Sequence, residues 1–132
     1  MKENLHYPVA QVIDLRHPVR FAGGPELRSG IRSGHIPGSF SFPYTIFFDK
    51  ENCFFPLEKI RKQLADIGVE ISAPIISLCG SGISAAILNF VLDLMNHPNH
   101  ALYDGSWAEW GAEKLYQGET SLTERPVETC LK

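Results

Sequence analysis

A cysteine in a glycine-rich loop is the feature of this sequence best suited to chemistry. The run LCGSGISA, residues 78–85, follows the apolar, β-branched stretch at 75–77 and precedes an apolar helical pattern over residues 85–95. We expect a strand, a tight loop and a helix, with Cys79 at the carboxyl end of the strand, where open α/β sheets bind ligands. The glycines let backbone N–H groups point at the sulfur, and these groups and the helix N-terminus favour the reactive thiolate. The alternative is a buried structural cysteine.

The elements that must position this loop follow from hydrophobic patterns. Short apolar or alternating runs predict strands, and a one-sided apolar pattern opened by Pro56 and ended by Gly68 predicts a helix. The second helix is apolar nearly all round, so we expect it to be heavily buried. Strands that alternate with helices predict an α/β domain with a mostly parallel sheet covered on both faces. The expected strands are 11–16, 39–44, 75–78 and 101–103, and the expected helices are 56–67, 85–95 and 107–116, the last capped by Ser106.

Length and composition bound the possibilities. The chain has 132 residues, 44% of them hydrophobic, with a net charge of -3. This suits one domain over 1–132, with a core at about 9–116 and a polar tail at 117–132 that is extended or partly ordered. No lysine or arginine cluster indicates a nucleic-acid partner, and no apolar run is long enough to span a membrane. The first six residues lack a secretory apolar core and the three cysteines form no disulfide framework, so a cytoplasmic location is expected.

Four short motifs occur in one order along residues 11–116. They are VIDLR at 12–16, SGHIPGS at 33–39, the cysteine loop, and YDGSWAEWG at 103–111. Together they resemble the rhodanese superfamily of sulfurtransferases. The loop, Cys-Gly-Ser-Gly-Ile-Ser-Ala, is most similar to that of the catalytic carboxyl-terminal domain of the 3-mercaptopyruvate sulfurtransferases. Thiosulfate-preferring members usually carry basic residues in this loop, and here there are none.

The resemblance implies roles for individual residues. Cys79 is the implied nucleophile, and Ser81 is the implied second catalytic residue. The segment at 22–38, with five glycines and two prolines, is irregular and long enough to be functional. Arg20, within an Arg-Phe pair, and Arg28 match the arginines that hold the keto-acid donor, with Arg32 as the alternative to Arg28. The remaining implied substrate-binding residues are Gly80, Gly82, Ile83 and Ser84.

Two departures from the family pattern bear on these roles. The mercaptopyruvate enzymes are usually tandem two-domain proteins, and the histidine and aspartate thought to act with the loop serine come from the other domain. Ser81 therefore lacks an evident partner: either His6 or His17 takes that place, or the relay is absent. The cleft is accordingly either more open or completed by a second copy of the chain or a separate partner domain.

The implied reaction moves sulfane sulfur. Cys79 would take sulfur from 3-mercaptopyruvate, or less well from thiosulfate, as a persulfide and pass it to cyanide or a thiol acceptor such as a thioredoxin or small thiol, releasing pyruvate. No cofactor or metal is implied. The alternatives are a persulfide relay module fed by a partner protein, a non-catalytic domain, and a cysteine phosphatase, although the loop lacks the arginine that a phosphate cradle needs.

Other conspicuous residues have structural interpretations. Asp14 and Arg16 are expected to brace the loop before the cleft by hydrogen bonds. His35 is expected to be a satisfied structural histidine in a turn. Trp107 and Trp110, three residues apart, are expected in the core, with Trp107 as an alternative wall of the cleft. Cys53 is interpreted as incidental, and Cys130 is either incidental or a thiol that resolves the persulfide as a disulfide.

Overall fold

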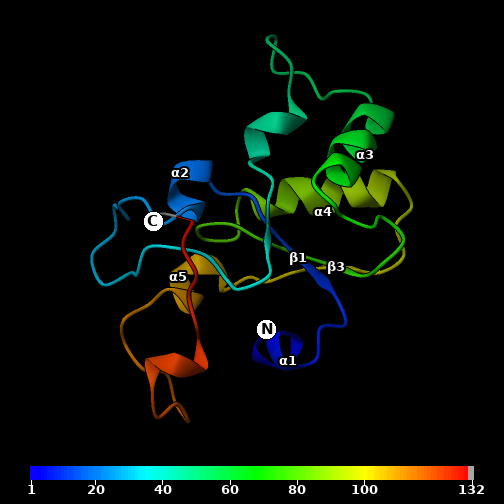
Figure 1. Ribbon diagram of the computed structural model, residues 1–132. Coiled ribbons are helices and arrows are strands. Elements are labelled where there is room, and N and C mark those ends of the chain that lie inside the picture. Colours follow the sequence, from blue (N-terminus) through cyan, green and yellow to red (C-terminus); the bar gives the residue numbers. More distant parts are fainter. Residues whose placement is uncertain (131–132) are drawn as a thin grey trace.

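The centre of the molecule is a parallel sheet of four strands, seen in a computed structural model that describes residues 1–130 (Figure 1). The strands are β1 (Gln11–Asp14), β2 (Phe40–Ser41), β3 (Ile75–Leu78) and β4 (His100–Leu102), in the order β2-β1-β3-β4. Every pairing is parallel, and Asp14 of β1 is in register with Ser41 of β2 and with Leu78 of β3. The predicted α/β class with a mostly parallel sheet is confirmed. All four strands therefore deliver the residues that follow them to one edge of the sheet.

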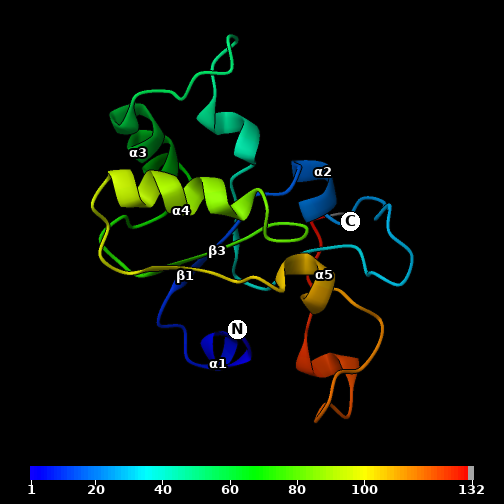
Figure 2. The ribbon, with the colours of Figure 1, turned by 180° about the vertical axis from the view of Figure 1, so that it is seen from behind.

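Helices cover both faces of this sheet (Figures 1 and 2). On one face lie α3 (Leu57–Asp66) and α4 (Ala85–Leu94), which bury Leu64 and Leu88 in the larger of two apolar clusters, together with Ile13 of β1. On the other face lie α1 (Lys2–His6) and α5 (Ser106–Trp110), and the smaller cluster gathers Val12 and Leu78 of the sheet with the tryptophans of α5. The central strands β1 and β3 are buried on both sides, which explains why they are apolar.

The predicted helices at 56–67 and 85–95 form, but the prediction of heavy burial for the second is wrong in part. On α4, Phe90 and Leu94 are each 50% exposed, while Leu88, Val91 and Leu92 are fully buried. Composition alone did not show this, because only one face of α4 meets the sheet. The expected strand at 39–44 is also shorter, since Tyr44–Phe47 forms a 3-10 helix, η1.

The segment after β1 forms a helix that the sequence did not predict. The strand β1 ends at Asp14, two residues earlier than expected, and Pro18 then opens α2 (Pro18–Phe21), where its missing N–H is tolerated in the first turn. Four residues are too few to show a helical period. This short helix places Arg20 beside the carboxyl ends of β1 and β3.

A buried ion pair fixes the turn into that segment. Arg16 donates to Asp14 from Nε (3.0 Å to Oδ2) and from Nη2 (2.7 Å to Oδ2), and its Nη2 also donates to the carbonyl oxygen of Gly34 at 2.7 Å. Both side chains are buried, and the Arg16 guanidinium lies 4.1 Å from the centre of the Trp107 ring. The expected brace is present, and it joins β1 to the far end of the irregular segment.

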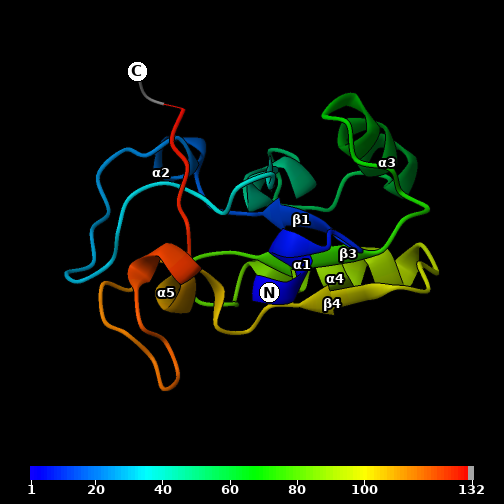
Figure 3. The same ribbon diagram turned by 60° about the horizontal axis from the view of Figure 1, so that its bottom comes forward.

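The polar residues after α5 are held by a second buried arginine. The helix α5 ends at Trp110, six residues earlier than expected, and Arg125 donates to the carbonyl oxygens that this end leaves open, including those of Trp110 (2.7 Å) and Ala112 (3.0 Å). A short 3-10 helix, η2 (Leu122–Glu124), precedes this arginine. The chain then pairs with His35 through Glu128 and reaches the end of α2, where the Cys130 N–H donates to Ala22 O at 2.9 Å (Figure 3). We call residues 125–130 the C-terminal strap.

No helix among residues 1–130 is both long enough and apolar enough to cross a membrane.

The start of the chain is tied to the residues before the C-terminal strap by Glu119, which gives an expectation for acid conditions. A hydrogen bond from the Lys2 ammonium and one from the Tyr116 N–H, with help from Arg125, hold the pKa of Glu119 to about 2 against an ordinary value of 4.5. Because the folded pKa is depressed, this carboxylate stabilises the fold above pH 4.5, and its contribution is lost as the pH falls toward 2.

We expect Glu119→Gln to lower the free energy of unfolding near neutral pH, with the difference from wild type vanishing toward pH 2. Urea unfolding across this range measures it, and a difference that does not change with pH would contradict the assignment.

Candidate active site

Cys79 lies one residue beyond β3, with only 3% of its surface exposed. Backbone groups of α5 fix it there: the Trp107 N–H donates to Cys79 O and the Ala108 N–H donates to Gly80 O, each at 3.0 Å. The Cys79 N–H donates to the Ser106 hydroxyl at 3.2 Å. The prediction that Ser106 caps α5 is therefore wrong, because its hydroxyl instead links the cysteine loop to the Tyr103 carbonyl, to which it donates.

The cysteine loop, residues 79–84, leaves its backbone donors free. Within the described residues, the N–H groups from Gly80 to Ala85 have no acceptor, while the carbonyls of Cys79 and Gly80 are taken by α5. Gly82 has a φ of +91°, and a Cβ there would lie 3.2 Å from Asp104 O, so this turn favours glycine on both counts. Together with the N-terminus of α4, these free donors are available to an anion next to the thiol.

Both predicted arginines reach this loop. Arg28 Nη2 donates to Gly80 O at 3.0 Å, and a Cβ on Gly80 would lie 3.3 Å from that nitrogen and 3.5 Å from Arg20 Nη1. Gly80 therefore leaves room for two guanidinium groups. Arg32, the alternative to Arg28, instead donates to Trp110 O and Gly111 O at the end of α5, which is a structural role.

The arginines are held by a carboxylate that the sequence analysis did not single out. Glu26 accepts from Arg20 Nη2 at 2.7 Å and from Arg20 Nε at 3.3 Å, and it lies 3.8 Å from Arg28 Nε. This pairing uses one edge of the Arg20 fork and leaves Nη1 of both arginines without a protein acceptor among the described residues. The Nη1 group of each arginine is therefore available to a ligand of the cavity that both side chains line.

These groups line a cavity of about 280 Å³. Six of the predicted site residues line this cavity, and two do not. Gly82 forms the turn of the loop, with a positive φ, and the Ile83 side chain is 80% exposed. Tyr44, at the start of η1, is a lining residue that the sequence analysis missed; its place just after β2, at the same sheet edge as Cys79, was the available signal. The lining residues are Leu15, Arg16, His17, Arg20, Arg28, Tyr44, Cys79, Gly80, Ser81 and Ser84.

Ser81 has no histidine partner among the described residues. It is exposed and makes no hydrogen bond there. His17 lines the same cavity, but its Nδ1 accepts from the Val19 N–H at 3.3 Å. His6 lies on α1, which covers the face of the sheet opposite α3 and α4 (Figure 1). Of the two proposed substitutes, His17 alone is near.

The residues given structural interpretations have these places. His35 is buried, stacks on Phe21 with ring centroids 3.8 Å apart, and bonds Phe21 O through Nδ1 at 2.7 Å. Trp107 and Trp110 are buried in the smaller cluster, and neither lines the cavity. All three cysteines are free, and Cys53 and Cys130 are exposed.

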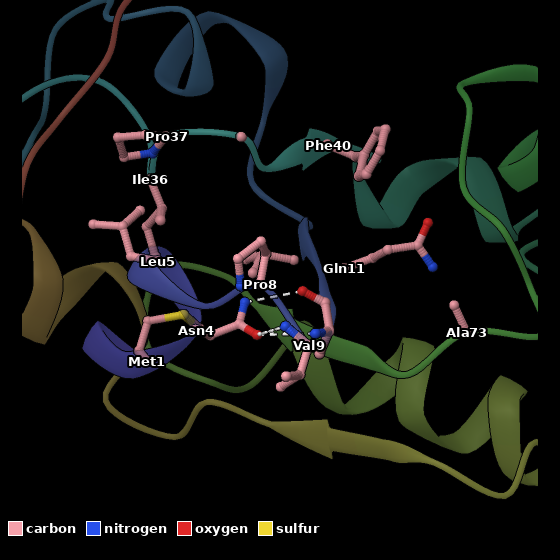
Figure 4. A pocket seen from close by; sticks show the side chains of 13 residues that line it. Met1, Asn4, Leu5, Pro8, Val9, Gln11, Ile36, Pro37, Phe40 and Ala73 are labelled. Atoms are coloured by element: carbon pink, nitrogen blue, oxygen red, sulfur yellow. Dashed lines mark hydrogen bonds between the residues drawn. The ribbon is translucent and has the colours of Figure 1, made fainter.

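A larger hollow of about 520 Å³ lies away from the cysteine, between α1 and the sheet (Figure 4). Leu5, Val9 and Ile36 give it an apolar lining. The Asn4 side chain at its edge donates to Ala10 O and accepts from the N–H groups of Val9 and Ala10. None of its lining side chains is titratable or nucleophilic. The smaller cavity, where thiol, free amides and guanidinium groups meet, is therefore the candidate active site.

Comparison with known proteins identifies the family of the chain. Residues 1–113 match the family model described as rhodanese-like domain, and the chain therefore belongs to the family of rhodanese-like domains. It is 40% identical to the human 3-mercaptopyruvate sulfurtransferase over 111 residues, covering 83% of this chain and 37% of that protein. It is also 40% identical to the mitochondrial thiosulfate/3-mercaptopyruvate sulfurtransferase 1 of Arabidopsis thaliana over 114 residues, 86% of this chain and 30% of that protein.

A solved structure supports the same assignment. The crystal structure of the Tum1 protein from Saccharomyces cerevisiae superposes with a TM-score of 0.69 at 38% identity, covering 82% of this chain and 38% of that chain. The chain thus spans about a third of the length of the relatives it matches.

Proposed function

We propose that this domain is a sulfurtransferase that accepts sulfane sulfur from 3-mercaptopyruvate, and less well from thiosulfate, on Cys79. The observation that carries the proposal is the meeting of a buried thiol, two arginines and a loop whose N–H groups have no acceptor among residues 1–130, all at one small cavity. The names of the relatives at 40% identity support the same chemistry.

In the first step, the Cys79 thiolate attacks the sulfur of mercaptopyruvate. A sulfur–sulfur bond forms, the carbon–sulfur bond breaks, and its electron pair leaves on the enolate of pyruvate. The proton of the substrate thiol passes to that enolate, which leaves pyruvate and an anionic Cys79 persulfide. The loop N–H groups would stabilise the anionic sulfur before and after transfer, and such preorganised donors contribute roughly 3 kcal/mol each in measured oxyanion sites.

The arginines would orient the donor. Its carboxylate would fit between Arg20 and Arg28, which line the cavity with Cys79 and approach the loop at Gly80. In the second step, a thiol acceptor such as a thioredoxin or small thiol, or cyanide in vitro, takes the outer sulfur and restores the Cys79 thiolate. A transfer in two half-reactions predicts ping-pong kinetics.

The direct test is turnover of each donor with a thiol acceptor. We expect pyruvate and sulfide release from mercaptopyruvate, slower turnover of thiosulfate, and none in Cys79→Ser, because serine cannot carry a sulfane sulfur. Cys130→Ser should retain activity, since this exposed cysteine does not line the cavity. Absence of turnover with both donors would refute the proposal and favour a relay domain fed by a partner protein.

A second prediction concerns Arg20. Lysine lacks the planar fork, so Arg20→Lys cannot keep both bonds to Glu26 and still present a donor to the substrate. We expect the KM for mercaptopyruvate to rise by about tenfold or more, while the free energy of unfolding changes by less than about 1 kcal/mol, because lysine keeps a positive charge beside Glu26 and the Arg20 side chain is 27% exposed. Steady-state kinetics and urea unfolding measure the two effects. An unchanged KM would show that Arg20 does not hold the donor.

A further inference from the structure

Glu26 is a buried carboxylate beside a site that binds anions. Its side chain is only 4% exposed, and it accepts hydrogen bonds from the Arg20 guanidinium and, at 3.1 Å, from the Leu27 N–H. Arg28 Nε completes its surroundings at 3.8 Å. A negative charge in this position opposes the binding of any anion, so its presence needs an explanation beyond holding two side chains in place.

The charge state of Glu26 follows from these contacts. Burial disfavours its charged form, but the hydrogen bond from Arg20 and the positive charges of Arg20 and Arg28 outweigh that cost and lower the pKa of the carboxyl. Glu26 is thus ionised wherever the protein is folded near neutral pH. It remains a fixed negative charge against the back of both guanidinium groups.

The charges around the cavity nearly cancel. Arg16 lines the cavity but is neutralised by Asp14, and Glu26 cancels one of the two charges carried by Arg20 and Arg28. One net positive charge is left to face a bound anion when residue 79 is uncharged, as in the Cys79→Ser protein. A ligand with one negative charge matches this site, whereas a dianion brings one charge more than the site can balance.

We propose that Glu26 determines the charge class of the ligand, favouring monoanionic donors such as keto-acid carboxylates over dianionic donors such as thiosulfate. The proposal rests on the proposed function in that these anions are the sulfur donors. Glu26 acts in two separable ways: its carboxylate shape positions the arginines, and its charge sets the preference.

Two substitutions separate shape from charge. Glu26→Gln keeps the length of the side chain and removes the charge, and Glu26→Asp keeps the charge and withdraws the carboxylate by one methylene. Glu58→Gln is the matched control, because it changes the net charge of the chain equally but lies on α3, where its side chain is 86% exposed and outside the cavity.

Binding is measured calorimetrically in a Cys79→Ser background, where thiosulfate cannot react, with pyruvate as the monoanion and thiosulfate as the dianion. We expect Glu26→Gln to improve the affinity for thiosulfate relative to pyruvate by about tenfold, the order expected when a unit charge is removed within a Debye length of a partly solvated anion. The ratio of kcat/KM values in the Cys79 protein should shift in the same direction. Glu26→Asp should weaken both anions with their ratio unchanged within about twofold, and Glu58→Gln should change neither.

The outcomes distinguish this inference from the proposed function. An unchanged ratio in Glu26→Gln, or equal ratios in Glu26→Gln and Glu26→Asp, would overturn the role of the charge even if the enzyme turns over mercaptopyruvate. Failure of the unaltered cavity to bind either anion would also overturn it. A charge-dependent ratio in binding without turnover of either donor would support the inference and refute the sulfurtransferase.

Discussion

Two backbone hydrogen bonds from the start of α5 to the carbonyls of Cys79 and Gly80 determine what the cysteine loop can do. A peptide group has its carbonyl and N–H directed to opposite sides, so a loop whose carbonyls are held by α5 turns N–H groups the other way. The Ser106 hydroxyl accepts from the Cys79 N–H and anchors the start of the same loop. The helix α5, which follows β4, thereby leaves the N–H groups of the cysteine loop, which follows β3, available to an anion.

The second constraint is the brace between Asp14, Arg16 and Gly34. It closes the irregular segment into a loop that starts and ends at the sheet. Within that segment, α2 and Glu26 direct Arg20 and Arg28 toward the cysteine loop. The C-terminal strap supports this arrangement from outside by pairing with His35 and with the end of α2. The cavity is thus lined by residues of three stretches, 15–28, Tyr44 and 79–84, which meet at one thiol because all lie at the carboxyl edge of a parallel sheet.

The parts of this structure that could be predicted are those coded by local pattern. The apolar strands β1 and β3, the amphipathic helix α3 and the glycine loop after Cys79 each carry their signal within about ten residues. The helix α2 carries no such signal, because four residues starting at Pro18 do not complete a recognisable period. The exposed face of α4 and the burial of Arg125 depend on which surfaces the rest of the fold covers. A local sequence pattern does not indicate this.

The site was predictable to a similar degree. Cys79 follows from the loop chemistry, and Arg20 and Arg28 came from the family resemblance, whereas Glu26 and Tyr44 emerge only when the irregular segment and η1 are seen against the loop. Glu26 in particular resembles any surface glutamate in sequence. Its pairing with both arginines is a tertiary contact, and its meaning depends on the cavity they line.

The mass of the protein after one turnover shows whether Cys79 carries the transferred sulfur. Mixing the protein with mercaptopyruvate in the absence of a thiol acceptor should release one pyruvate per chain and add the mass of one sulfur atom to the peptide that contains Cys79. Subsequent addition of a thiol should remove that mass. Pyruvate release without added mass on Cys79, or added mass on Cys53 or Cys130 instead, would contradict the account.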